Sequence, residues 1–157
     1  MQTHKVKTAS INDFREWYNK KELILAPEFQ RRKVWSLKAK SYLIDTVLNS
    51  FPIPAIYIRQ KIDLEKKKTV REVVDGQQRI RAILDYINDK FTVLDIHNKE
   101  YENLEFSELS NEIKERFLEY ELPVVFLTGA DDSDVLEVFS RINSYNIVLN
   151  LQEKFTA

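Results

Sequence analysis

The amino-acid sequence predicts an α+β fold. Short apolar segments rich in β-branched residues predict strands at residues 3–9, 55–58, 70–74, 91–96 and 122–127. Apolar residues at helical spacing predict helices between these strands, beginning at Ser10, Ser36, Gln77, near Glu108 and at Ser133. Ser10 and Ser36 are also favourable N-caps, and Asp13 follows Ser10 at the position that completes a capping box.

Composition limits the protein class. A chain of 157 residues with 43% hydrophobic and 31% charged residues has the size and balance of one folded globular domain. With 24 basic and 25 acidic residues the net charge is −1, so any contact with nucleic acid must use a local basic patch. The chain has no cysteine, which excludes disulfides and thiolate ligands, and no long apolar run. We therefore expect a cytoplasmic protein without membrane contact.

The most informative stretch is the junction between the strand that ends at Val74 and the helix that starts at Gln77. Asp75 and Gly76 separate the two elements. Such a junction directs backbone N–H groups and the positive end of the helix dipole at one point, which favours an anion. Arg79 lies in the first helical turn, where a cation is unfavourable unless it has an anionic partner. The pattern predicts a phosphate site.

The same residues also have a purely structural interpretation. Asp75 as N-cap with Gln78 three residues later forms a capping box, and Gly76 permits a tight turn. This interpretation leaves Arg79 unexplained. One glycine with one arginine is a weak phosphate signature compared with a full P-loop, so local chemistry leaves both interpretations open.

Two further polar segments lie at the ends of apolar elements. Arg31, Arg32 and Lys33 come just before the helix that starts at Ser36, between the aromatic residues Phe29 and Trp35. Arg141 and Asn143 come at the end of the helix that starts at Ser133. We expect these residues and the Asp75–Arg79 turn to share one pocket at an end of the sheet. Arginine suits phosphate oxygens, and an amide suits a base or a ribose.

Other features predict structure and not chemistry. His4 and His97 have no serine or acidic partner at a diagnostic spacing, and we interpret both as surface residues. Residues 61–69 predict a charged turn with solvated lysines. The strand at 122–127 is expected near the sheet centre, with Pro123 at its first ladder position.

The carboxy-terminal end of the sequence predicts a break and a new helix. The helix from Ser133 is expected to end at residues 141–144, and Asn150 with Glu153 to open another helix that stops at Ala157. We expect residues 1–157 to form a single domain of a longer chain.

Four segments together resemble a known family. They are, in order, Pro27–Trp35, Leu43–Leu48 with Phe51–Pro54, Val73–Arg79 with its Asp-Gly-Gln-Gln-Arg string, and Val138–Asn143. In this order they resemble the amino-terminal domain of GmrSD-type restriction endonucleases, which belongs to the wider ParB/sulfiredoxin-like group. The resemblance covers nearly the whole chain.

The resemblance implies an α+β fold of the ParB/sulfiredoxin-like type, with a small mixed sheet packed with helices. It also implies a domain that binds and hydrolyses nucleoside triphosphates with Mg²⁺ and regulates a separate nuclease domain acting on modified foreign DNA, as in bacterial anti-phage defence. Carried onto this sequence, the implied catalytic residues are Asp75, Gln78 and Arg79, with Asp75 also the metal ligand. The implied nucleotide-binding residues are Arg31, Arg32, Gly76, Gln77, Arg79, Arg141 and Asn143.

Two alternatives remain open at this stage. Arg31, Arg32, Lys33 and Trp35 suit a DNA-binding module without catalysis, whose affinity would fall steeply with salt. The second alternative is nuclease activity within the domain, as in some ParB-like folds. The histidine-asparagine-histidine nuclease domain of the family is not among these 157 residues, so we do not expect DNA cleavage by this segment alone.

Overall fold

A five-stranded mixed sheet forms the centre of the fold, in a computed structural model that describes residues 3–25 and 35–156, with side chains as far as Tyr145. The strand order is β1-β5-β3-β4-β2. Neighbouring strands alternate between antiparallel pairing (β1 with β5, β3 with β4) and parallel pairing (β5 with β3, β4 with β2). The strands are β1 Thr3–Ser10, β2 Leu23–Ile24, β3 Ile56–Asp63, β4 Lys68–Asp75 and β5 Glu121–Thr128. This confirms the predicted α+β class with a small mixed sheet.

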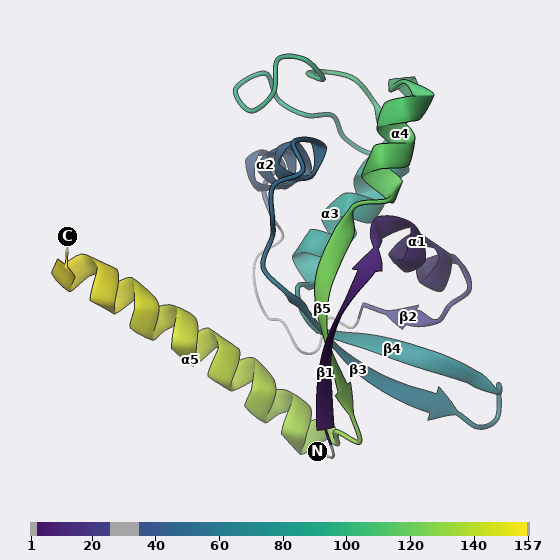
Figure 1. Cartoon of the computed structure of the whole chain (residues 1–157), viewed down its shortest axis with the longest axis vertical. Coiled ribbons are helices and arrows are strands. Elements are labelled where there is room, and N and C mark those ends of the chain that lie inside the picture. Colours follow the sequence, from purple (N-terminus) through teal and green to yellow (C-terminus); the bar gives the residue numbers. More distant parts are fainter. Residues whose placement is uncertain (1–2, 26–34, 157) are drawn as a thin grey trace.

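Helices gather beside the sheet, and the last one extends away from it (Figure 1). The helices are α1 Ile11–Asn19, α2 Leu37–Leu48, α3 Gln77–Ile87, α4 Asn111–Leu118 and α5 Asp132–Thr156, with a short 3-10 helix at Phe106–Glu108. Among the described residues no helix is long and apolar enough to cross a membrane.

The main core lies between α1–α4 and one face of the sheet. Its fully buried side chains include Ile58 of β3, Val73 of β4, Ile80 of α3 and Phe117 of α4. A smaller apolar cluster lies on the opposite face, where Val135 at the start of α5 packs with Val74 and Leu127. The first turns of α5 therefore cover the sheet face that α1–α4 leave open.

Local sequence explains where most helices begin. The Ser10 hydroxyl accepts a hydrogen bond from the Asp13 N–H at 3.0 Å, and the Asp13 carboxylate accepts one from the Ser10 N–H at 3.0 Å. Ser36 caps α2 through the Ala39 N–H at 3.2 Å. Both capping predictions are confirmed, because each serine satisfies an N–H group that the helix leaves without a partner.

The strand predicted at residues 91–96 is wrong. Val93 makes one isolated bridge to Glu102, and the segment is otherwise irregular. Val93 is fully buried, and the Leu94 N–H donates to the Ser41 hydroxyl at 2.8 Å. The apolar residues that suggested a strand thus fill the core from a loop that is bound to α2.

The same serine, Ser41, contacts the Nδ1 atom of His97 at 2.7 Å, so His97 fixes this loop and is not a free surface residue.

Three boundaries differ from the predictions. The helix predicted to begin near Glu108 is confined to Asn111–Leu118. The predicted turn at 61–69 is shorter, because β3 continues to Asp63 and β4 begins at Lys68. Pro123 is the third residue of β5 and pairs with Thr8, but it precedes Val124, where pairing with the central strand β3 begins.

The predicted break near residues 141–144 is also wrong, because α5 is continuous from Asp132 to Thr156. Residues 132–156 contain neither glycine nor proline, so no residue in this stretch interrupts the helical hydrogen bonds. The end of α5 that lies against the sheet therefore belongs to the same helix as the part that extends away from it (Figure 1).

Candidate functional site

A pocket of about 750 Å³ lies where the start of α3 meets α2 and α5. This volume is in the range of small-molecule sites. Asp75 and Arg79 form the part of its wall at the end of β4. The remaining lining residues are Trp35, Ala39, Tyr42, Leu43 and Thr46 before and within α2, Phe51–Ala55, Tyr57 of β3, and Ile142 and Asn143 of α5.

A bulge in β4 directs Asp75. Tyr57 pairs with Asp75 and Ile58 pairs with Val73, so Val74 is the extra residue between two consecutive pairs. A bulge of this kind bends a strand and re-aims the side chain that follows it. Asp75 consequently lines the pocket at the point where the strand ends.

Gly76 makes the turn from β4 into α3. It is the N-cap of α3 with φ +100°, and no side chain caps this helix. The predicted capping box of Asp75 and Gln78 is therefore wrong, because the N-cap falls one residue later. A Cβ atom at Gly76 would lie 2.5 Å from Ile56 Cδ1 and 3.2 Å from Arg79 Nη2. Both the positive φ and the close approach of Ile56 thus require glycine.

The Arg79 guanidinium joins the turn to the loop before β3. It donates to the Pro54 carbonyl, to the Ala55 carbonyl at 3.2 Å and to the Asp75 carboxylate at 3.4 Å. Burial lowers the pKa of Arg79 from its ordinary value, and the charge of Asp75 opposes that shift. The sequence required an anionic partner for a cation at this position, and Asp75 is that partner.

The pocket includes only part of the predicted site. Asp75, Arg79 and Asn143 lie in its wall. Gln77 is buried and donates to the Val73 carbonyl at 3.2 Å, while Gln78 is half-buried, and neither residue lines the pocket.

Arg141 differs from Asn143 although both are on α5. The Arg141 side chain is 66% exposed and pairs with Glu137 at 2.7 Å, one turn earlier on the helix. The structure thus places Arg141 on the outer side of α5 and not in the pocket. Arg31 and Arg32 lie outside the described residues, so their predicted role stays a prediction.

Aromatic residues that the sequence analysis did not assign to the site line the pocket. Tyr42 and Phe51 are 64% and 60% exposed, which is unusual for large rings beside a core. The Tyr120 hydroxyl donates to the Phe51 carbonyl at 2.6 Å and fixes the loop that carries this ring. The sequence held one indication of this role: Tyr42 lies outside the apolar face of its helix.

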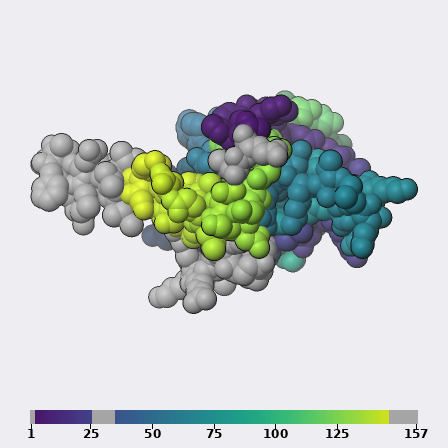
Figure 2. All heavy atoms as spheres, turned by 90° about the horizontal axis from the view of Figure 1, so that it is seen from below, coloured from purple at the N-terminus to yellow at the C-terminus, as the bar shows by residue number. Residues whose placement is uncertain are grey.

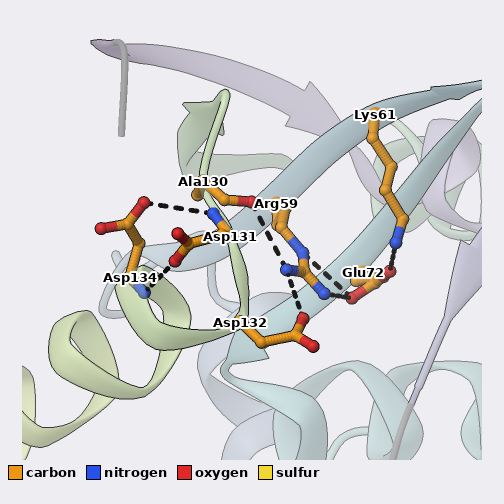
Figure 3. Close-up of polar contacts among 7 residues, drawn as sticks. All are labelled: Arg59, Lys61, Glu72, Ala130, Asp131, Asp132 and Asp134. Carbon is orange, nitrogen blue, oxygen red and sulfur yellow. Dashed lines mark hydrogen bonds and ion pairs between the residues drawn. The ribbon is translucent and has the colours of Figure 1, made fainter.

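A buried arginine links the sheet to an exposed aspartate at the start of α5 (Figure 3). The Arg59 guanidinium of β3 contacts the Glu72 carboxylate of β4 at 2.5 Å and the Asp132 carboxylate at the start of α5 at 2.8 Å. Lys61 also pairs with Glu72, at 2.8 Å. Reciprocal hydrogen bonds between Asp131 and Asp134 close the first turn of α5. Because α5 is continuous, these contacts also position Asn143 at the pocket.

The charges in this network stabilise one another. Burial alone would raise the pKa of Glu72, but hydrogen bonds from Lys61 and Arg59 outweigh burial and hold the pKa below its usual value. Burial likewise opposes the charge of Arg59, yet the hydrogen bonds to Glu72 and Asp132 raise its pKa. The hydrogen bond from Arg59 lowers the pKa of Asp132.

No preformed metal cage occurs in the described part of the chain, where no three histidine or acidic side chains converge. Asp75 is the carboxylate of the pocket wall. A single carboxylate suits Mg²⁺ that arrives with phosphates, because this ion usually keeps water and phosphate oxygens as its other ligands.

The fold and the site together define a class of protein: an α+β domain with a pocket at a strand-to-helix turn. The family model of the GmrSD restriction endonuclease, N-terminal domain, matches residues 14–157. The chain therefore belongs to this family. Comparisons of the chain with curated proteins and with solved structures found no match.

Replacing Gly76 with alanine should destabilise the domain by about 2–3 kcal/mol, because the positive φ and the contact with Ile56 act together. Gly129→Ala is the matched control, since Gly129 also has a positive φ of 68°. We expect that variant to lose only about 1 kcal/mol. Urea unfolding measures both, and equal losses would contradict the close approach at Gly76.

Glu72→Gln should lower the free energy of unfolding by about 2 kcal/mol at pH 7, because Arg59 then keeps only the exposed carboxylate of Asp132 as an ionic partner. The pKa of Glu72 is lower in the folded state, so its stabilisation is present above about pH 4–5 and is lost as pH falls through the folded pKa. The difference between the wild type and Glu72→Gln should therefore shrink towards pH 3.

The control for this pH dependence is Glu65→Gln, which removes an exposed carboxylate from the same hairpin. We expect a change within about 0.5 kcal/mol at every pH. A wild-type advantage over Glu72→Gln that did not vary between pH 7 and pH 3 would disprove the role of the ionised carboxylate.

Proposed function

We propose that this domain binds a nucleoside triphosphate with Mg²⁺ in the pocket at the start of α3 and hydrolyses it. The observation that carries this proposal is that one pocket is lined by Asp75 and Arg79, by exposed aromatic rings and by Asn143. These groups match the three parts of a nucleotide, which are phosphates, base and sugar.

The phosphates would be held at the start of α3. No side chain caps this helix, and the positive end of its dipole favours an anion beside Asp75 and Arg79. Arg79 adds a positive charge that is fixed in direction by the Pro54 and Ala55 carbonyls. A guanidinium that is already oriented loses little freedom when it binds phosphate.

The base would be held by the aromatic side of the pocket. Tyr42 and Phe51 present exposed rings, and stacking of a base on an aromatic ring is worth about 1–3 kcal/mol. The Asn143 amide has both a donor and an acceptor and can bond a base edge or a ribose hydroxyl. Such a bond would bring α5 into contact with the nucleotide.

Hydrolysis requires a water oxygen to bond the γ-phosphorus while the bond to the β–γ bridging oxygen breaks, which yields a nucleoside diphosphate and inorganic phosphate. Asp75 would be the metal ligand, and a bound Mg²⁺ supplies charge neutralisation at the phosphates. Arg79 would stabilise charge on the leaving group. Gln78 does not line the pocket, so the proposal assigns it no contact with the nucleotide.

The family sets the context of this activity. As an amino-terminal domain of a restriction endonuclease, the domain would use nucleotide binding to regulate a separate nuclease domain that acts on foreign DNA. Contact of Asn143 with the nucleotide would transmit binding to α5, because the helix is continuous beyond the pocket.

Calorimetric titration of ATP, GTP, CTP and UTP with Mg²⁺ tests the proposal. The wild type should bind at least one of them, and Arg79→Ala should abolish binding. Tyr42→Ala should weaken binding about 5- to 150-fold through loss of stacking, without unfolding the domain, because its ring is exposed.

Arg81→Ala and Tyr18→Ala are the matched controls. Arg81 is an exposed arginine on the same helix, and Tyr18 is an exposed tyrosine of α1; neither lines the pocket. Both variants should bind as the wild type does. Absence of binding by the wild type, or equal losses in the variants and their controls, would reject the nucleotide site.

A further inference from the structure

The β3–β4 hairpin extends away from the helices, on the side of the molecule opposite to α5 (Figures 1 and 2). Its turn is tightly held, because the Asp63 carboxylate accepts hydrogen bonds from the Glu65 and Lys66 N–H groups, each at 3.1 Å. Lys67 completes the turn with φ 52°. The hairpin is thus a firm two-stranded ribbon with its tip in solvent.

A shallow groove of about 520 Å³ follows this hairpin to the neighbouring strand β2. Its cations are Lys21, Lys61, Lys66 and Lys68. We call these residues, with Lys67 at the tip, the basic hairpin surface. The Lys68 ammonium donates to the Lys21 carbonyl at 3.1 Å. This hydrogen bond links the hairpin to the segment that leads into β2.

Large apolar side chains lie among these lysines. Leu64 is 83% exposed at the tip, Ile62 is 70% exposed and Ile24 of β2 is 39% exposed. All three line the groove. A surface that only contacts water does not need exposed aliphatic side chains among its lysines. Their presence here indicates a binding surface.

The lysines of the basic hairpin surface outnumber the carboxylates of the groove. Lys61 and Arg59 are paired with Glu72, so this group of charges contributes little to the field outside. Asp63 and Glu65 offset part of the charge of the other lysines, and the balance stays positive. The chain as a whole has a charge of −1, so this concentration of lysines is local. The surface is complementary to a polyanion.

We propose that the basic hairpin surface binds the phosphate backbone of duplex DNA. A two-stranded ribbon fits the major groove, lysines neutralise phosphates on either side, and an exposed aliphatic tip can contact sugars and thymine methyl groups. The groove shares no lining residue with the nucleotide pocket. Its residues differ from Arg31–Lys33, which the sequence singled out for DNA and which lie outside the described residues.

The surface also has a physical connection to α5. Glu72 lines the groove and pairs with Arg59, and Arg59 pairs in turn with Asp132 at the start of α5 (Figure 3). The DNA surface and the helix that reaches the nucleotide pocket are thus supported by the same buried guanidinium.

The test is fluorescence anisotropy of a labelled 20-base-pair duplex with the whole 157-residue chain at 50–200 mM salt. The variant Lys21→Gln/Lys66→Gln/Lys67→Gln removes lysines that have no side-chain partner among the described residues. Each phosphate contact contributes about 0.9 to the slope of log affinity against log salt, so the slope should fall by about 2–3. Affinity at 50 mM salt should fall at least tenfold.

The matched control is Lys5→Gln/Lys7→Gln/Lys99→Gln, which removes the same charge from exposed positions outside the groove. It should keep the wild-type slope, and both triple variants should keep nucleotide binding, which separates this surface from the pocket. Equal losses in the two triple variants, or no duplex binding by the wild type at 50 mM salt, would overturn the proposal. The proposal would also be overturned if a poly-glutamate peptide competed as effectively as unlabelled duplex. That result would assign the surface to an acidic protein segment.

Discussion

The Arg79 guanidinium is the interaction on which the site depends. It contacts the Pro54 and Ala55 carbonyls and the Asp75 carboxylate, and so holds together the loop before β3, the end of β4 and the start of α3. Gly76 makes this possible, because any side chain there would meet Ile56 and the guanidinium itself. One cation therefore shapes the pocket even without a ligand, and the same cation is the natural partner of a phosphate.

The second constraint is the attachment of α5. Arg59 lies on the sheet face opposite to the main core and is held by Glu72 and Asp132. Val135 of α5 also packs with Val74 of β4. A buried arginine without these carboxylates would be strongly unfavourable. The pair therefore fixes where the helix begins, and the continuous helix then carries Asn143 to the pocket wall.

Sequence reasoning found the fold class, the Ser10 and Ser36 caps and the strand-to-helix turn, since each depends on residues close together in the chain. It misplaced the N-cap at Asp75, because a left-handed glycine and a bulge at Val74 are set by the sheet and not by a local pattern. The predicted break in α5 failed for the opposite reason: polar residues such as Asn143 suggested an end, but no residue there stops a helix. The exposed rings of Tyr42 and Phe51 could not be assigned to a site from spacing, because only tertiary structure brings α2 and its following loop beside Asp75 and Arg79.

The central claim is that the Asp75–Arg79 turn and α5 form one nucleotide pocket. The most direct measurement is a backbone amide NMR titration with Mg²⁺ and a non-hydrolysable nucleoside triphosphate. The account predicts that the largest shift changes occur together at Gly76–Arg79 and at Ile142–Asn143, with the tip of the β3–β4 hairpin unaffected. Shift changes confined to the hairpin, or at the turn without α5, would contradict it.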